Sequence, residues 1–251
     1  ARIATGSGTG GSRSLPVGGA ALANAAMTLA EKLKVLASDV LEAGTGDLVL
    51  ANGEVRVAGT DKAISYAALA ALPDAKPEML HELQTWTPPE ATYPNGTHVC
   101  ELEVDADTGM VSVERYTVVD DFGVTVNPLL LAGQVMGGIA QGIGQALMEN
   151  IAYDAGGQIL TATLLDYALP RADHVPNIHF ETRNVPCVTN AIGVKGAGEA
   201  GAIGSCPAVM NALSRQLRRE MLEAVTDAAA TARVLVLTGS GRAFSSGQDL
   251  A

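Results

Sequence analysis

The spacing of apolar positions in the first third of the chain predicts one long helix followed by a hairpin. Apolar side chains recur at helical intervals over residues 17–41, which is typical of an amphipathic helix. Two short apolar runs within residues 48–57 are joined by Asn52-Gly53, a dipeptide that favours a tight hairpin turn. A second short helix is predicted over residues 65–72, and the proline-containing segment 73–94 is expected to be a connection.

The middle of the chain alternates between strand and helix patterns. Residues 98–104 and 110–119 are predicted strands, joined by a turn at residues 105–109 that is rich in Asp and ends in Gly. A long helix is predicted over residues 129–150, and a further strand over residues 178–182. Strands and helices are therefore mixed along the chain, which indicates an α+β fold.

Glycine is concentrated in a few clusters of this sequence. The chain has 28 Gly among 251 residues. Five lie inside the predicted helix 129–150, namely Gly133, Gly137, Gly138, Gly142 and Gly144. Each costs a helix about 1 kcal/mol relative to Ala. We therefore expect close packing or ligand approach at these positions.

The last 59 residues begin with another glycine-rich stretch, residues 193–204, which is predicted to be a loop. From Pro207 the pattern becomes helical, with proline suited to the first turn. Residues 233–238 are then predicted to form a strand. The chain is thus expected to end in a helix and a strand.

Composition excludes several classes of protein. The net charge of -11 and a pI near 4.7 argue against nucleic-acid binding, which depends on Lys and Arg contacts to phosphate. No apolar run is long enough to span a membrane, and the N-terminus lacks the pattern of a signal peptide. The odd, widely spaced cysteines Cys100, Cys187 and Cys206 suit a reducing compartment. We expect a soluble, cytoplasmic protein without a protein-ligated metal.

The first candidate site is the glycine loop that precedes the long helix. Gly6, Gly8 and Gly11 satisfy G-x-G-x-x-G, but the dinucleotide-binding motif also requires a preceding strand, and only five residues precede Gly6. A narrower hypothesis is that residues 10–14, GGSRS, offer backbone N–H groups, two hydroxyls and a guanidinium to an anion such as phosphate. The alternative is a flexible loop.

The second candidate is Glu199, flanked by Gly198, Ala200 and Gly201. Small neighbours allow its carboxylate to approach a ligand closely. A carboxylate in a confined loop can act as a general base, with Lys195 nearby to hold an anion. A solvated surface glutamate is the alternative that spacing alone favours.

Gln134 and the pair Asp120-Asp121 complete the candidates. Gln134, inside the glycine-rich helix, offers an amide to a polar ligand, although a core glutamine with satisfied hydrogen bonds fits equally well. Asp120 and Asp121 end a predicted strand, where consecutive side chains point to opposite faces. Turn formation is therefore favoured over an acid-base pair.

Five phrases of the sequence carry a resemblance to a known family. They are GTGGSRSLPVGGAAL, VDDFGVTVNPLLLAGQVMGGIAQGIGQAL, DYALPRAD, VPCVTNAIGVKGAGEAGAIG and PAVMNA. Residues 1 to about 212 resemble the C-terminal part of the molybdopterin-binding large subunit of the xanthine dehydrogenase, aldehyde oxidase and carbon monoxide dehydrogenase family. The resemblance implies an oxidoreductase component that hydroxylates an aldehyde, an N-heterocycle or a related small substrate.

The same resemblance implies a cofactor, partners and residue roles. The cofactor is molybdenum-molybdopterin, and its cytosine dinucleotide form is left open. The residues implied to contact the pterin and its phosphate are Gly11, Ser12, Arg13 and Ser14. Gln134 is implied to lie beside the molybdenum, with Lys195 and Gly198 as neighbours of the cofactor. Glu199 matches the catalytic glutamate, a base toward the molybdenum-bound hydroxyl. Electrons pass to iron-sulfur and FAD subunits, and the upstream part of the large subunit supplies the substrate pocket.

The last 45 residues depart from that family. The NAL helix, the strand RVLVLTG and the loop AFSSGQDL resemble the start of a crotonase-type enoyl-CoA hydratase/isomerase, which implies an oxyanion-binding N–H at Gln248. Residues 1–206 carry a net charge of -12, against +1 for residues 207–251. We therefore expect two portions, a molybdopterin-binding fragment and a crotonase-like helix-strand appendage. CoA-thioester chemistry and a non-catalytic chimeric remnant remain alternatives to the hydroxylase.

Overall fold

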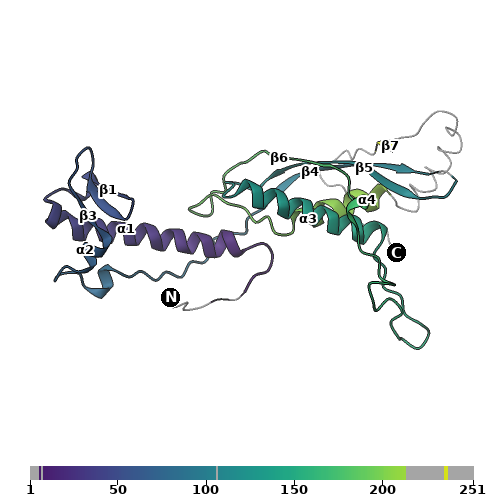
Figure 1. The fold of residues 1–251 in the computed structure, drawn as a ribbon, viewed down its shortest axis with the longest axis horizontal. Helices are drawn as coiled ribbons and strands as arrows, with labels where there is room; N and C mark the ends of the chain where they lie inside the picture. Colours follow the sequence, from purple (N-terminus) through teal and green to yellow (C-terminus); the bar gives the residue numbers. More distant parts are fainter. Residues whose placement is uncertain (1–5, 7, 106, 213–234, 237–251) are drawn as a thin grey trace. The chain divides into compact units, whose positions relative to one another are not determined.

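The computed structural model describes residue 6, residues 8–105, residues 107–212 and residues 235–236 (Figure 1). Helices and small sheets are mixed along the chain, which confirms the α+β prediction. The chain divides into two compact units, Ala1–Ala91 with Val188–Ile192, and Thr92–Cys187 with Gly193–Ala251. The expected boundary between residues 206 and 207 concerns sequence origin and stays a prediction. No helix in the described ranges is long and apolar enough to cross a membrane.

The first unit is built around helix α1, Ala20–Leu41, which follows a π-helical segment at Ser14–Gly19. The helix predicted over residues 17–41 is thereby confirmed. Its last turn buries Ala37 and Leu41 against Leu48 and Val55 of a small sheet. Short helix α2, Tyr66–Ala70, adds Leu69 to this core. Apolar burial thus holds the first unit together at one end of α1.

The sheet of the first unit has three antiparallel strands in the order β1-β2-β3. They are Leu48–Ala51, Glu54–Val57 and Ala63–Ser65. Between β1 and β2, Asn52 has a φ of 52° and Gly53 a φ of 81°. Positive φ at both positions is the geometry that Asn-Gly favours in a two-residue hairpin, so the predicted hairpin is confirmed. Short 3-10 turns lie at Thr45–Asp47 and Pro77–Met79.

The sheet of the second unit has the order β6-β5-β4-β7. Its strands are β4 at Asn95–Val104, β5 at Val111–Asp121, β6 at Ile178–Thr182 and β7 at Leu235–Val236. Strand β6 runs parallel to β5, whereas the other neighbours are antiparallel. Strand β7 is the described part of the strand predicted over residues 233–238, and a 3-10 turn lies at Ala172–His174.

Helices α3, Pro128–Leu147, and α4, Ala200–Ala212, pack against this sheet (Figure 1). Asn127 caps α3 because its side chain accepts a hydrogen bond from the Leu130 N–H. The core combines side chains of β4, β5 and both helices, among them Tyr116, Val118, Val135, Ile139 and Val209. The second unit is thus a two-layer arrangement of helices on a sheet.

Glycines allow α3 and α4 to approach each other closely. A Cβ at Gly138 would lie 2.8 Å from the Ala202 nitrogen, and one at Gly201 would overlap the Val135 carbonyl oxygen. Gly142 similarly faces Ser205. By contrast, a Cβ at Gly133 or Gly137 would meet nothing within 4 Å. Close packing therefore accounts for only part of the glycine content of α3.

Helix α4 begins at Ala200, so the prediction of a loop through residue 204 and a helix start at Pro207 is wrong. In the sequence, Gly201 and Gly204 are typical of a loop. In the structure, their lack of a side chain allows α4 to pack closely on α3 and on the His98 ring. Pro207 lies inside the helix, where it cannot donate the usual backbone hydrogen bond. Tertiary packing outweighs both local signals.

The two kinds of glycine should respond oppositely to alanine. We expect Gly201→Ala to destabilise the second unit by about 1–3 kcal/mol, because its methyl group has no space against the α3 backbone. The control Gly137→Ala should be neutral or stabilising by up to about 1 kcal/mol. Urea unfolding monitored by circular dichroism measures both, and equal effects would contradict the packing argument.

Candidate functional site

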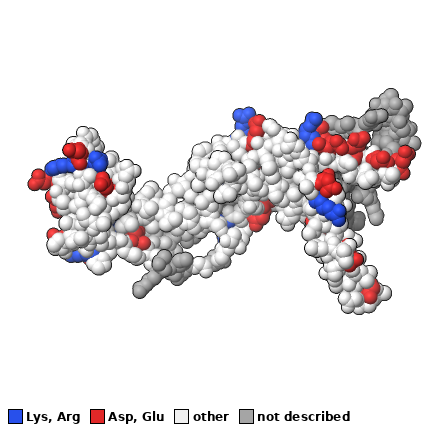
Figure 2. Space-filling view, viewed as in Figure 1, with Lys and Arg blue, Asp and Glu red and all other residues white. Residues whose placement is uncertain are grey.

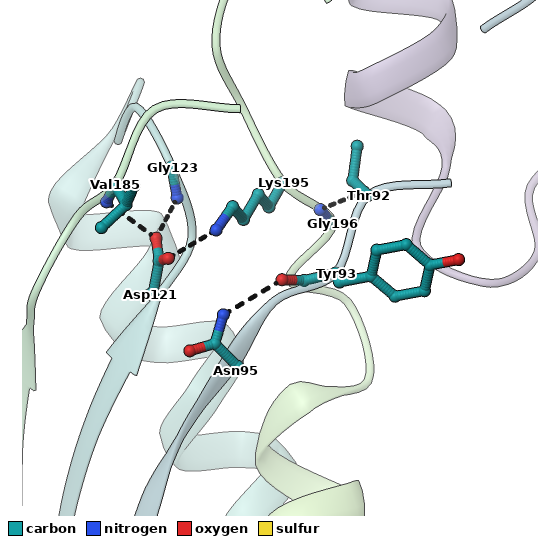
Figure 3. Close-up of polar contacts among 8 residues, drawn as sticks. All are labelled: Thr92, Tyr93, Asn95, Asp121, Gly123, Val185, Lys195 and Gly196. Carbon is teal, nitrogen blue, oxygen red and sulfur yellow. Dashed lines mark hydrogen bonds and ion pairs between the residues drawn. The ribbon is translucent and has the colours of Figure 1, made fainter. Parts of the chain in front are cut away.

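Asp121, the last residue of β5, organises the loop at residues 193–199 (Figure 3). Its Oδ1 accepts hydrogen bonds from the N–H groups of Gly123 at 2.8 Å and Val185 at 3.0 Å. Its Oδ2 lies 2.5 Å from Lys195 Nζ. The side chains of Asp121 and Lys195 are only 10% and 12% exposed. One carboxylate thus joins the end of β5 to Val185 and Lys195, which lie 64 and 74 residues further along the chain.

Backbone hydrogen bonds hold the start of the same loop against the end of β5. The Lys195 N–H donates to the Phe122 carbonyl at 2.8 Å, and the Val124 N–H donates to the Gly193 carbonyl at 2.8 Å. Gly123 has a φ of 66°, and a Cβ there would overlap the Gly193 carbonyl oxygen. Glycine is therefore required at position 123 both for its backbone conformation and for this close approach.

The end of the loop is tied to α3 and leads directly to Glu199. Gln134 donates from Nε2 to the Gly198 carbonyl at 2.7 Å, and the Gly196 N–H donates to Thr92 Oγ1 at 3.1 Å (Figure 3). The Glu199 carbonyl accepts from the Ile203 N–H at 3.0 Å, so Glu199 is the first residue bonded into α4. Its side chain is exposed at the N-terminus of that helix.

The structure therefore brings Gln134, Gly198 and Glu199 together, with Lys195 on the same loop. Glu199 differs from the sequence expectation in its surroundings, since it begins a helix and does not lie in a confined loop. A helix N-terminus favours a negatively charged side chain, because unpaired backbone N–H groups point toward it. The site offers a carboxylate and an amide at one end of the α3-α4 pair.

The remaining predicted residues, Gly11 to Ser14, lie in the first unit and form a tight turn before α1. Gly11 and Ser12 have φ values of 59° and 56°. The hydroxyl oxygens of Thr9 and Ser14 lie 2.6 Å apart, and the Arg13 carbonyl accepts from the Val17 N–H as the helical segment begins. The Arg13 side chain is exposed.

The donor groups of this turn fit an anionic, phosphate-bearing cofactor. Backbone N–H groups at the start of a helix, hydroxyls and a guanidinium all donate hydrogen bonds to phosphate oxygens. A Cβ at Gly10 or Gly11 would meet nothing within 4 Å, so the backbone is accessible there. Within the described ranges, His, Cys, Asp and Glu side chains form no group of three that could hold a metal ion.

Sequence reasoning missed a second polar group, formed by Asp120, His98 and Tyr116. His98 Nε2 lies 3.4 Å from Asp120 Oδ1, and His98 Nδ1 lies 2.8 Å from the Tyr116 hydroxyl. Asp120 is 4% exposed, and its Oδ2 has no hydrogen-bond partner among the residues described. Burial raises the pKa of the Tyr116 hydroxyl, and the nearby Cys100 and Asp120 act in the same direction.

Asp120 and Asp121 both belong to β5, so Asp120 does not lie in the predicted turn. Asp121 ends the strand and accepts from the Gly123 N–H two residues on, which is the contact of an Asx turn. The two carboxylates have separate partners, as expected for consecutive strand residues that point to opposite faces. The buried contacts of Asp120 depend on the pairing register of β4 and β5, in which Gly96 faces Asp120. No local motif in the sequence reports that register.

Comparison with known families now identifies the class of protein. The molybdopterin cofactor-binding domain family matches residues 1–176, and the chain belongs to this family. The enoyl-CoA hydratase/isomerase family matches residues 205–251. Of these, residues 213–234 and 237–251, including Gln248, lie outside the described residues.

Individual relatives agree with this family. The chain is 36% identical over 223 residues to the nicotine 6-hydroxylase large subunit of Paenarthrobacter nicotinovorans, covering 85% of the chain and 27% of that protein. It is 34% identical over 215 residues to the carbon monoxide dehydrogenase large chain of Afipia carboxidovorans, covering 83% and 27%. The chain thus spans about a quarter of the length of these relatives.

A solved structure shows the same likeness in three dimensions. Quinoline 2-oxidoreductase from Pseudomonas putida 86 superimposes with a TM-score of 0.74 at 34% identity, covering 84% of this chain and 28% of that one. A crystal structure of Cu,Mo-CO dehydrogenase gives a TM-score of 0.73 at 34% identity, covering 82% and 27%. The fold is therefore that of part of these larger chains.

The environment of Asp121 predicts a pH dependence of stability. Burial alone would raise the pKa of this carboxyl, but hydrogen bonds from Lys195, Val185 and Gly123 and the Lys195 charge hold it below its ordinary value. A carboxyl with a lowered folded-state pKa stabilises the fold above its unfolded-state pKa of about 3.9, and this contribution is lost as the pH falls through the folded value.

We therefore expect the Asp121→Asn variant to have a lower urea midpoint than the wild type at pH 7. As the pH falls from 6 to 2, the midpoint of the variant should decrease less steeply than that of the wild type. The control Asp74→Asn removes an exposed carboxylate from the first unit and should leave the profile of the wild type unchanged. Urea midpoints measured across this range provide the test. A variant profile as steep as that of the wild type would contradict the assigned role of Asp121.

Proposed function

We propose that this chain is part of the large subunit of a molybdenum hydroxylase. In this proposal it contributes to the hydroxylation of an aldehyde, an N-heterocycle or a related small molecule. The observation that carries the proposal is the hydrogen bond from Gln134 to Gly198, which places an amide beside Glu199 at the start of α4. Support comes from relatives whose names describe a hydroxylase, a dehydrogenase and an oxidoreductase.

The chain's own residues have separate roles in this proposal. Gly11, Ser12, Arg13 and Ser14 hold the phosphate of the pterin cofactor through N–H, hydroxyl and guanidinium donors. The Gln134 amide and the Gly198 backbone orient the cofactor at the α3-α4 end. Glu199 accepts a proton at its carboxylate oxygens as general base. When bound, the molybdenum-pterin group supplies the redox and oxygen-transfer chemistry of hydroxylation.

Further protein is required around this chain in the proposed enzyme. Its partners are iron-sulfur and FAD subunits, which accept the electrons, and the remainder of the large subunit, which completes the substrate pocket. Support comes from large apolar side chains exposed in the second unit, such as Leu129 at 82% and Leu165 at 96%. On the drawn face, the charged side chains form small clusters, and wide uncharged areas separate these clusters (Figure 2). An odd number of widely spaced cysteines supports a cytoplasmic location.

A second inference concerns the end of the chain. We infer that residues from about 207 onward derive from the N-terminal part of a crotonase-type enzyme, and that residues 1–206 derive from the molybdenum hydroxylase. Support comes from the family match at residues 205–251 and from the change in net charge from -12 to +1. Binding of crotonyl-CoA in isothermal titration would favour a function in CoA-thioester chemistry over a non-catalytic remnant.

Cofactor analysis of the purified chain tests the main proposal. After expression in a molybdenum-replete host, we expect stoichiometric molybdenum, measured by mass spectrometry, and pterin, measured by fluorescence. Glu199→Gln should retain both, because a base is not needed for cofactor binding. In the assembled hydroxylase it should lower kcat by about 10²–10⁴-fold.

The control for this experiment is Glu90→Gln, an exposed glutamate in the first unit, which should change neither cofactor content nor kcat. A wild-type chain without molybdenum and pterin would contradict cofactor binding by this portion of the subunit. Full activity of a cofactor-loaded Glu199→Gln enzyme would contradict the role of Glu199 as base.

A further inference from the structure

The loop that presents Gly198 and Glu199 has few side chains that stabilise it by packing: Val194 is fully buried and Ala197 packs against the core, but the other apolar contacts are lost to glycine. Residues 193–198 read GVKGAG, and Lys195 is the one long side chain among them. Glycine loses more conformational freedom on ordering than any other residue. A fixed position for this loop therefore requires specific anchors.

Besides the backbone hydrogen bonds of Gly193 and Lys195, three anchors occur in succession along the loop, and Figure 3 shows the first two. Lys195 Nζ pairs with Asp121 Oδ2 at 2.5 Å, the Gly196 N–H donates to Thr92 Oγ1, and the Gly198 carbonyl accepts from Gln134. The first anchor is an ion pair with both side chains nearly buried. Loss of one partner would leave an uncompensated buried charge, so a substitution of either residue should loosen the contact between the two segments.

We propose that the Asp121-Lys195 ion pair positions Gly198 and Glu199 for the cofactor, with both residues acting as positioning residues. This proposal rests on the proposed function and assigns Lys195 a contact different from the anion ligand that the sequence suggested. Asp121 is suited to the role because its other oxygen is fixed by the Gly123 and Val185 N–H groups. The carboxylate therefore has a defined position before it binds the ammonium group.

A double-mutant cycle distinguishes this role from a direct contact between Lys195 and the cofactor. Lys195→Met removes the ammonium group, whereas Asp121→Asn keeps a carbonyl oxygen for the two N–H donors and removes the charge. For a positioning pair, each single variant should lower the molybdenum and pterin content by about tenfold. The double variant should be no worse than the more severe single variant, because both substitutions break one interaction.

Hydrogen exchange of the cofactor-free chain gives a readout that is independent of cofactor binding. We expect the amides of residues 193–198 to exchange about ten times faster in both single variants, and the amides of β4 and β5, which respond only to the loss of overall stability, to be accelerated less. In cofactor-loaded protein, the Mo(V) electron paramagnetic resonance signal should change shape in both variants. The control Lys62→Met breaks an exposed pair with Glu42 in the first unit and should change none of these readouts.

Three outcomes would overturn the proposal. Loss of cofactor in Lys195→Met but not in Asp121→Asn would show that Lys195 binds the cofactor directly. Wild-type exchange rates in the loop of both variants would show that the pair does not order it. Equal acceleration throughout β4, β5 and the loop would show that the pair only stabilises the fold. If the wild-type chain binds no molybdenum, the proposed function fails, and the exchange experiment still tests the ordering of the loop.

Discussion

The contact between Gly138 of α3 and Gly201 of α4 determines where the other groups of the second unit lie. A backbone-to-backbone approach leaves no room for adjustment, since a methyl group at either position would overlap the facing helix. Gln134 lies one turn before Gly138 on the same side of α3. Gly198 lies just before α4, opposite that turn, and the two are joined by a hydrogen bond. The position of Glu199 thus depends on two residues that have no side chain.

Asp121 provides a different kind of constraint. Glycine packing is a matter of shape and does not depend on pH, whereas the Asp121 carboxylate stabilises its surroundings only while it is ionised. The two constraints act at opposite ends of the same loop, one through Lys195 and the other through Gly198 and α4. Together they fix a glycine-rich segment in which Val194 is the one large apolar side chain.

The periodic elements were predictable from the sequence because their signals are local. Residues 17–41 and the Asn52-Gly53 hairpin were correctly assigned, since spacing and turn chemistry act over a few residues. The start of α4 was not predictable, because Gly201 and Gly204 take their helical conformation from packing against distant residues. The partners of Lys195 and His98 depend on strand register and loop closure. Only the residue types at the site, and not their contacts, could be inferred.

Helix α4 also bears on the proposal that this chain joins segments of different origin. The match to the enoyl-CoA hydratase/isomerase family begins at residue 205, inside this helix and beyond Gly201. A recombination breakpoint within a helix requires only that the incoming residues continue a 3.6-residue repeat. A breakpoint that shifts a strand by one residue would turn every following side chain to the other face of the sheet. Helices such as α4 are therefore tolerant sites for gene fusion, and strands are not.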